Sequence, residues 1–145
     1  MKILYLSNSR IPSITANSIH VFKMSEAFKK NGSTLRLIGI KPSLFYSEII
    51  NYKDRYGIIN NIDFKTFIQL RGFKGYDYLF KVKKECKKYN PDIVYTRSIG
   101  IAYHISKMGY DIIYEAHGPL YSSEENIFKD FLNSKHFKFM VVISD

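Results

Sequence analysis

Short apolar runs alternate with longer amphipathic stretches along the whole chain, and this alternation constrains the fold more than any other feature. Strands are predicted at Ile3–Ser7, Thr34–Ile40, Asp63–Leu70, Asp92–Thr96, Asp111–Glu115 and Phe139–Ser144. Each run is mostly apolar on both faces, as is typical of parallel strands covered on two sides. Strands that alternate with helices through right-handed crossovers form a doubly wound sheet. The predicted fold class is therefore α/β: a single Rossmann-like doubly wound parallel sheet of about six strands with helices on both faces.

Helical patterns occupy the intervals between these strands. The first helix is expected from about Ser18 to Lys30, with Asn17 or Ser18 as its N-cap and with Glu26 and Lys30 as an exposed i,i+4 pair. A clearer helix ends before Pro91, because apolar residues recur on one face and lysines on the other: Leu79, Val82, Cys86 and Tyr89 against Lys81, Lys84 and Lys88. Weaker helical patterns occur at Ser43–Tyr52, Ile99–Met108 and Glu124–Ser134, and Arg71–Gly75 is predicted to be a loop.

A chain of 145 residues suits one domain and not two. Hydrophobic residues make up 46% of it, which is enough apolar material for a core, so disorder is not expected. Cys86 is the only cysteine, which excludes an intramolecular disulfide and fits a reducing compartment. The first apolar run is too short for an export signal, and no run of about 18 apolar residues occurs. We therefore expect a cytoplasmic protein that could contact the inner face of a membrane only peripherally.

The formal charge of +9 is unevenly distributed along the chain. Residues 1–40 hold six basic residues and one acidic, residues 71–90 hold seven and two, and residues 111–145 hold three and six. A basic surface of this kind favours anionic partners: nucleic acid, anionic lipid or phosphorylated small molecules. A lysine-rich helix could meet anionic lipid or could simply be a solvated face: Lys81, Lys83, Lys84, Lys87 and Lys88. Its aromatic residues are expected mainly on the core side, which favours the solvated face. Basic and aromatic residues do not interleave outside residues 71–90, so nucleic acid is not expected as a partner.

Two common nucleotide-binding motifs are missing from the sequence. A dinucleotide-binding fold needs G-x-G-x-x-G after its first strand, whereas residues 7–12 here read Ser-Asn-Ser-Arg-Ile-Pro and contain no glycine. A phosphate-binding P-loop needs Gly-Lys-Ser/Thr, which occurs nowhere in the chain. Any ligand must therefore be held differently at the carboxyl ends of the strands, where open α/β sheets bind their ligands.

Four segments resemble, in order and spacing, the family 4 glycosyltransferases, which have two Rossmann-like domains in the GT-B arrangement. The longest is Arg10–Phe28, which is similar to the start of that family. The others look like its fourth strand, its fifth strand with a histidine loop, and its sixth strand: Asp92–Ser98, Ile113–Pro119 and Val141–Ser144. The resemblance covers essentially all of residues 1–145. It implies an amino-terminal, acceptor-side domain, and the donor-binding carboxyl-terminal domain, with its pair of glutamates seven residues apart, is absent from this sequence.

The resemblance also implies roles for individual residues. His117 should touch the donor sugar and act through orientation and electrostatics, because the family is retaining and uses no obvious protein nucleophile. The donor would also meet Ala16, Asn17 and Ser18 at the helix start, and Gly118. Family members often carry two glycines where this chain has Ala16-Asn17, but free N–H groups at a helix N-terminus can still bind a phosphate. The alternatives are that Asn17 is only a helix cap and that His117 is only a turn residue bonded to carbonyls.

Two residues at strand ends are candidates for contact with the acceptor. Arg97 could hold an acceptor phosphate or carboxylate, or pair with a nearby acid. Glu115 could accept from an acceptor hydroxyl or act as a base, or it could bond loop amides. The other three histidines are expected to be surface or internally bonded residues: His20, His104 and His136. No pattern supports a metal, and no cofactor is expected, because a nucleotide-sugar would be a substrate.

The sequence thus predicts the acceptor-side domain of a retaining glycosyltransferase that moves a sugar from a nucleotide-sugar to a glycan or lipid-linked acceptor, as in polysaccharide biosynthesis. Alone it is expected to be inactive, because the chemistry of that family takes place between two domains; whether this chain is itself an enzyme is left open. Two alternatives are a non-catalytic Rossmann-like interaction module and a basic nucleic-acid-binding domain.

Overall fold

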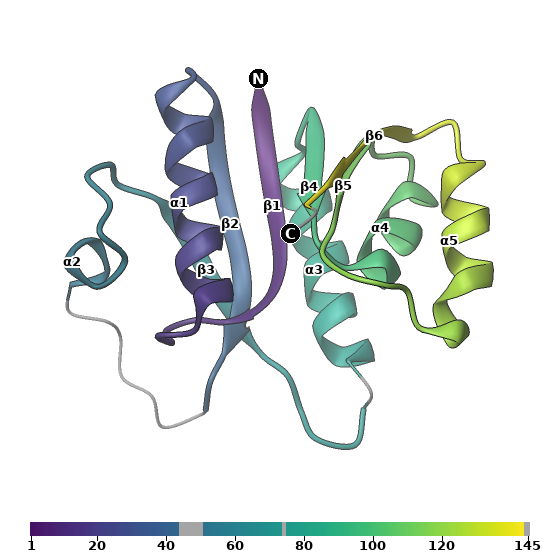
Figure 1. Cartoon of the computed structure of the whole chain (residues 1–145), viewed down its shortest axis with the longest axis horizontal. Helices are drawn as coiled ribbons and strands as arrows, with labels where there is room; N and C mark the ends of the chain where they lie inside the picture. The colour runs from purple at the N-terminus through teal and green to yellow at the C-terminus, as the bar shows by residue number, and fades with distance from the viewer. Residues whose placement is uncertain (44–50, 74, 144–145) are drawn as a thin grey trace.

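The computed structural model describes residues 1–43, 51–73 and 75–143. Six parallel strands form one open sheet in the order β3-β2-β1-β4-β5-β6 (Figure 1). The strands are β1 (Lys2–Arg10), β2 (Thr34–Lys41), β3 (Asp63–Ile68), β4 (Ile93–Thr96), β5 (Ile112–Ala116) and β6 (Phe137–Val142). The helices are α1 (Ala16–Lys30), α2 (Tyr52–Tyr56), α3 (Tyr76–Tyr89), α4 (Ile99–Ser106) and α5 (Glu125–Leu132), with a 3-10 turn η1 (Ser122–Glu124) before α5. The predicted α/β doubly wound sheet is confirmed.

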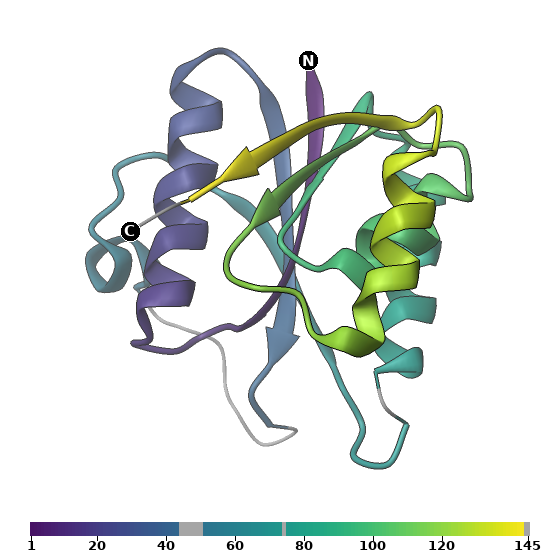
Figure 2. The same ribbon diagram turned by 45° about the vertical axis from the view of Figure 1, so that its right-hand side comes forward.

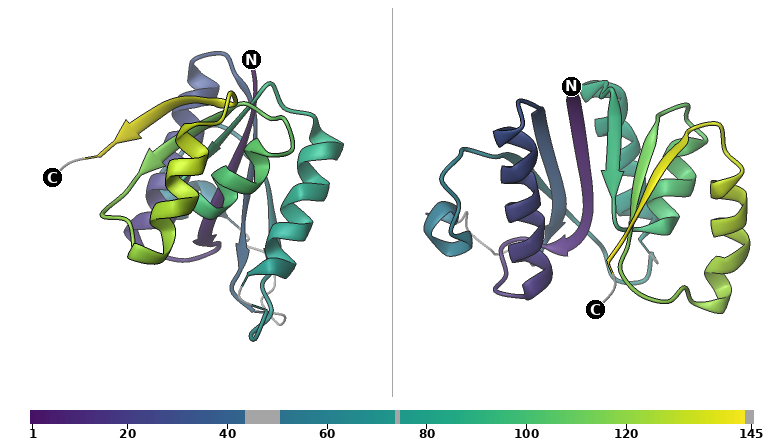
Figure 3. Two further views of the ribbon diagram at one scale, coloured as in Figure 1. Left: turned by 90° about the vertical axis from the view of Figure 1, so that its right-hand side faces the viewer. Right: turned by 45° about the horizontal axis from the view of Figure 1, so that its top comes forward.

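The helices divide between the two faces of the sheet, as Figures 2 and 3 show. On one face, Val21 and Phe22 of α1 pack with Tyr56 of α2 over the apolar side chains of β1 and β2. The rings of Phe22 and Tyr56 stack with their centroids 4.1 Å apart. On the other face, α3, α4 and α5 bury Cys86, Phe131 and their neighbours in a second, larger apolar cluster. The helices change faces between β1 and β4, which places the topological switch point of the sheet at these two central strands.

The start of α1 differs from the prediction. The N-cap is Thr15, whose hydroxyl accepts from the Ser18 backbone N–H at 3.4 Å, and not Asn17 or Ser18. The Ser18 hydroxyl instead donates inward to the carbonyls of Ser13 and Thr15 at 3.0 and 2.9 Å, and Ser18 is fully buried. Because the Ser18 hydroxyl donates to these carbonyls, the helix N-terminus is capped by the hydroxyl of Thr15.

The expected exposed Glu26–Lys30 pair is wrong in one respect. The two side chains do form an ion pair at 3.3 Å, but Glu26 is buried. Its carboxylate accepts from the backbone N–H groups of Ile59 and Asn60 at 2.6 and 3.2 Å. These bonds lower the pKa of Glu26 from its usual 4.5 to about 2, with a smaller contribution from Lys30. Glu26 therefore attaches α1 to the segment between α2 and β3.

Strand β6 also departs from the expectation. It begins two residues earlier than predicted, at Phe137, and its last five residues are exposed, so it is not covered on both faces. It lies at the edge of the sheet, where fewer neighbours cover a strand. The helix predicted at Ser43–Tyr52 falls largely outside the described residues, and α2 begins at Tyr52. No helix in the described part of the chain is long and apolar enough to cross a membrane.

Candidate functional site

The candidate site lies at the carboxyl ends of the central strands, where the turns after β1, β4 and β5 meet. Side-chain bonds hold β1 to the end of β4 and to α3, and one further bond shapes the turn after β4. Thr96, the last residue of β4, donates to the Leu6 carbonyl of β1 at 2.8 Å and accepts from the Ser98 N–H at 3.2 Å. From the other face, Tyr78 of α3 donates to the Ser7 carbonyl at 2.7 Å. The end of β1 is thus held from both sides.

His117 lines a cavity of about 360 Å³ at this edge of the sheet. It follows β5 directly, and its side chain is exposed, so its imidazole is free to meet a ligand. Gly118 next to it has φ +147°, a backbone conformation that L side chains rarely adopt, and the turn therefore depends on glycine. The remaining wall of the cavity comes from β1, β5, the turn after β4 with the start of α4, and the segment leading into α5: Asn8, Arg97, Ser98, Ile99, Tyr114, Pro119, Leu120, Tyr121 and Glu124.

A second cavity of about 500 Å³ shares Asn8 and Ser98 with the first and lies on the side of α3 and α4. Its polar lining includes Arg10, Gln69, Tyr76 and His104. Burial lowers the pKa of His104, and the charges of Lys83 and Lys107 lower it further, so this histidine is neutral near pH 7. His104 was not predicted to line a cavity, because it lies inside a predicted helix.

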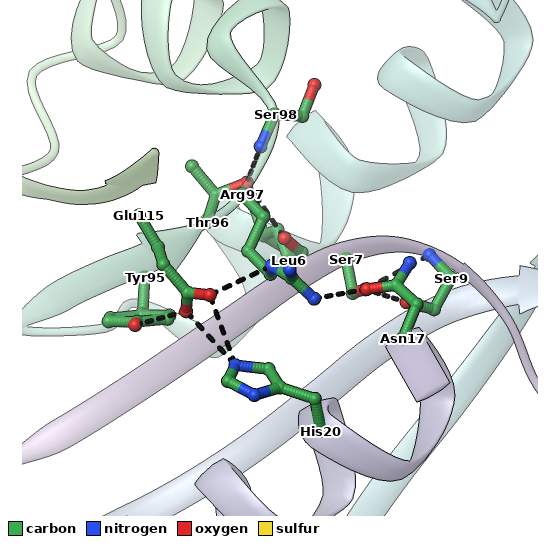
Figure 4. A network of polar contacts seen from close by, with 10 residues as sticks. All are labelled: Leu6, Ser7, Ser9, Asn17, His20, Tyr95, Thr96, Arg97, Ser98 and Glu115. Atoms are coloured by element: carbon green, nitrogen blue, oxygen red, sulfur yellow. Dashed lines mark hydrogen bonds and ion pairs between the residues drawn. The ribbon is translucent and has the colours of Figure 1, made fainter. Parts of the chain in front are cut away.

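Glu115 is the centre of a buried polar network, drawn in Figure 4. Its carboxylate is fully buried and accepts a hydrogen bond from Tyr95 of the neighbouring strand β4. Arg97 Nε lies 3.0 Å from Glu115 Oε1, an ion pair without the alignment of a hydrogen bond, and the Arg97 side chain is 8% exposed. On the other side, His20 Nε2 of α1 lies 3.1 Å from the same oxygen. Of the alternatives for Arg97, the structure shows the pair with a nearby acid.

Two tyrosines beside Glu115 have pKa values far above the usual one, mainly because they are buried. Burial raises the pKa of Tyr5 and that of Tyr95 far above the usual 10, and the charge of Glu115 raises both further. The hydroxyl of Tyr5 is buried and has no hydrogen-bond partner among the described residues, nor does Glu115 Oε1. Among the described residues Glu115 contacts side chains and not loop amides, which were one of its expected partners. Through Tyr95 and His20, Glu115 of β5 connects this strand to β4 and to α1.

The helix N-terminus that was predicted to face the donor is connected to this network. Arg97 donates from Nη1 to the side-chain oxygen of Asn17, which joins the turn after β4 to the first turn of α1. Ala16 and Asn17 are exposed, so they remain accessible to a ligand, whereas the side chain of Ser18 is buried and bonded internally. The predicted site residues therefore separate into two groups: Ala16, Asn17, His117 and Gly118 at the surface, and Ser18, Arg97 and Glu115 beneath it.

Sequence reasoning missed two members of the site. His20 was expected to be an ordinary helix residue, yet its ring points from α1 toward Glu115 (Figure 4). Its position three residues after Asn17, on the same side of α1, is the signal that could have suggested this. Asn8 lines both cavities, but nothing in the sequence distinguished it from its neighbours. Among the described residues, no three His, Cys, Asp or Glu side chains gather as a metal site.

The chain is similar in structure to a UDP-GlcNAc 2-epimerase and to a glycosyltransferase. It aligns with the UDP-GlcNAc 2-epimerase of Methanocaldococcus jannaschii (TM-score 0.61, 17% identity, 99% of this chain and 40% of the epimerase). It aligns equally well with a glycosyltransferase of Rickettsia africae (TM-score 0.60, 19% identity, 99% of this chain and 36% of that protein). A structure of the M. jannaschii epimerase in complex with UDP-GlcNAc and UDP gives 0.59 at 18% identity, over 90% of this chain and 38% of that one.

The chain has the fold of a single Rossmann-like domain of the GT-B glycosyltransferase-like kind. At 17% to 19% identity the likenesses establish the fold alone. The chain spans 36% to 40% of the length of these proteins. No protein-family model and no curated protein sequence matches it.

Proposed function

We propose that this chain is the acceptor-side, amino-terminal domain of a nucleotide-sugar-dependent glycosyltransferase of the family 4 type. It would help to move a sugar from a nucleotide-sugar to a glycan or lipid-linked acceptor. The observation that carries the proposal is the position of His117: an exposed imidazole in a cavity at the switch point of a GT-B-like sheet. Ligands of open α/β sheets bind at this place.

In this proposal the surface residues of the site meet the donor. His117 hydrogen-bonds a sugar hydroxyl and stabilises the charge that develops between the anomeric carbon and the leaving phosphate. The first N–H groups of α1, around Ala16 and Asn17, face the diphosphate at the positive end of the helix dipole. Gly118 keeps the turn beside the sugar free of a side chain. Ser18 supports the turn that precedes α1 through its bonds to the Ser13 and Thr15 carbonyls.

Arg97 and Glu115 act at the site in different ways. Arg97 lines the cavity and has further N–H groups beyond those directed at Asn17 and Glu115, so it can bind an anionic group of the acceptor. Glu115 is fully buried, so we assign it to positioning Arg97 and His20 and not to acceptor contact. This assignment replaces the expectation that its carboxylate meets an acceptor hydroxyl.

A transferase is favoured over the 2-epimerase to which the fold is equally similar, because four segments of the sequence resemble the family 4 glycosyltransferases in order and spacing. Inverting a sugar carbon that carries hydrogen requires a base able to reach that carbon. Glu115 is enclosed by Tyr95, Arg97 and His20 and cannot serve. The candidate bases for the epimerase alternative are therefore His117 and Glu124, which line the cavity.

Most donor contacts would come from a second domain, because GT-B chemistry takes place between two. The isolated chain is therefore expected to be inactive and to gain little thermal stability from any nucleotide-sugar. We place the reaction in the cytoplasm and expect it to need neither metal nor cofactor. A non-catalytic interaction module would have the same fold without a reactive His117.

The proposal is tested by sugar transfer. The protein purified from its own cells is incubated with labelled nucleotide-sugars and a membrane extract as the source of acceptors. We expect incorporation of label, and a kcat lowered by on the order of 10²-fold or more in His117→Ala with the melting temperature unchanged. His136→Asn is the control. His136 pairs with Asp111 at the amino ends of β5 and β6, away from the site, so this variant should keep the normal kcat. Transfer at the wild-type rate by His117→Ala would refute the role of His117, and no transfer from any donor would refute the function.

A further inference from the structure

Large apolar side chains are exposed together in the segment that joins β3 to α3. Leu70 is 46% exposed, Phe73 56%, Tyr76 67% and Phe80 62%. The segment projects beyond the sheet at the carboxyl ends of the strands (Figure 1). A soluble surface seldom keeps four such side chains within eleven residues exposed without a partner. This overturns the sequence expectation that the aromatic residues here lie mainly on the core side, because only Tyr78 and Tyr89 do.

The outer face of α3 continues this apolar segment into a basic one. Tyr78, Val82 and Cys86 form the core side of the helix. Tyr76, Phe80 and Lys84, spaced four residues apart, lie on the opposite side. Lys84 Nζ lies 5.5 Å from the centre of the Phe80 ring. Going along the helix from its N-terminus, the outer face is therefore first aromatic and then lysine-rich.

The positive charge of this face is not neutralised by neighbouring acids. The lysine ion pairs among the described residues involve only Lys30, Lys65, Lys81 and Lys138. Lys84, Lys87 and Lys88 are exposed and belong to none of them. Asp77, the acid on the first turn of α3, is already used, since it accepts from the Leu70 N–H at 2.8 Å and pairs with Lys81 at 3.8 Å.

We propose that this surface, defined by Leu70, Phe73, Tyr76, Phe80, Lys84, Lys87 and Lys88, binds the surface of a membrane that contains anionic lipid. The apolar end inserts among the acyl chains and headgroups, and the lysines lie at the level of the lipid phosphates. Apolar and aromatic side chains beside lysines on one helix face are typical of interfacial binding. The charge selects anionic over zwitterionic lipid.

The order of the side chains favours a membrane over nucleic acid. Single strands bind on aromatic rings interleaved with basic groups along a groove. Here the apolar side chains are grouped at the projecting end, and the lysines follow as a separate group. Leu70 offers a nucleotide neither a ring nor a polar atom, whereas all four side chains gain from leaving water.

The proposed surface adjoins the larger of the two cavities. Tyr76 belongs to both, and Gln69 and Gly75 line the cavity from the same segment. Membrane binding would therefore place the opening of this cavity beside the lipid surface. The inference does not depend on the proposed transferase reaction, because lipid binding is measured without donor or acceptor.

Co-sedimentation with vesicles tests the proposal with the 145-residue chain. Binding is expected to vesicles of phosphatidylcholine mixed with phosphatidylglycerol and to be much weaker with phosphatidylcholine alone. Phe73→Ser combined with Phe80→Ser should lower the partition coefficient by about tenfold. Lys84→Gln, Lys87→Gln and Lys88→Gln together should lower it by on the order of 10- to 100-fold.

Matched controls separate this surface from general charge and hydrophobicity. Phe139→Ser removes an equally exposed phenylalanine from β6, and Lys129→Gln with Lys135→Gln removes two exposed lysines from the region of α5. Both controls should bind vesicles as the wild type does. Equal binding to both kinds of vesicle, equal loss in the controls, or binding to a single-stranded oligonucleotide without binding to vesicles would each overturn the proposal. Circular dichroism on each variant confirms that it is folded.

Discussion

Replacing Glu115 with Gln should strongly destabilise the domain. Gln has the shape of Glu and keeps an acceptor for Tyr95, but it removes the carboxylate that pairs with Arg97, the only one within ion-pair distance in the described part of the chain; the Arg97 side chain is 8% exposed. Breaking a buried ion pair by neutralising one partner costs about 3–5 kcal/mol. Asn17 still accepts from Arg97, so we expect the low end, about 3 kcal/mol. For a domain of this size that lowers the melting temperature by roughly 10 °C.

The assay is urea unfolding followed by circular dichroism, with the melting temperature as a second measure. Arg97→Gln and the double variant complete a mutant cycle, and the coupling energy should be about 1.5 kcal/mol or more. Glu124→Gln is the control, because Glu124 is partly exposed and bonds only a backbone N–H. If Glu115→Gln unfolds within about 0.5 kcal/mol of the wild type, the network does not join the three elements as argued.

Two further substitutions test the fold around the site. Glu26→Gln should lower stability at neutral pH, and its difference from the wild type should shrink as the pH falls from about 4.5 toward 2. The reason is that the lowered folded-state pKa of Glu26 gives stability that is present above the unfolded pKa and is lost as the pH falls through the folded pKa. A difference that is constant with pH in thermal melts would contradict this. Gly39→Ala should cost about 1–3 kcal/mol in urea unfolding, since its Cβ would lie 2.6 Å from Ile11 Cδ1 and 3.1 Å from the Ser9 carbonyl. Gly100→Ala, whose Cβ meets nothing closer than 4.0 Å, should be neutral or stabilising, and equal effects of the two would refute the steric argument.

The periodicity of the sequence was enough to predict the sheet and the main helices, because burial on both faces imposes a local pattern. It could not predict Glu26 as buried, since its partners Ile59 and Asn60 lie more than thirty residues away in a segment without strong pattern. The exposed β6 was missed for a related reason. Its apolar sequence indicates a covered strand, but coverage depends on what packs beside the edge of the sheet.

The sequence predicted where the site lies, but not which of its side chains are exposed and which are buried. The strand-end rule located His117, Arg97 and Glu115 at one edge of the sheet, and the structure brings their turns together there. Which of them is exposed depends on side-chain direction across three elements. The contact of His20 with Glu115 joins residues 95 positions apart, and only a folded sheet brings them together.

The most direct test of the central claim, that the strand-end turns form a nucleotide-sugar site, is an NMR titration of the chain with UDP-GlcNAc. The account predicts saturable amide shifts at millimolar ligand, confined to the turns around Asn8, Ala16–Asn17, Ser98 and His117–Gly118, and smaller shifts in His117→Ala. The amides of α5 and β6 should not move. Shifts that are strongest outside these turns, or none at any of them, would contradict the claim.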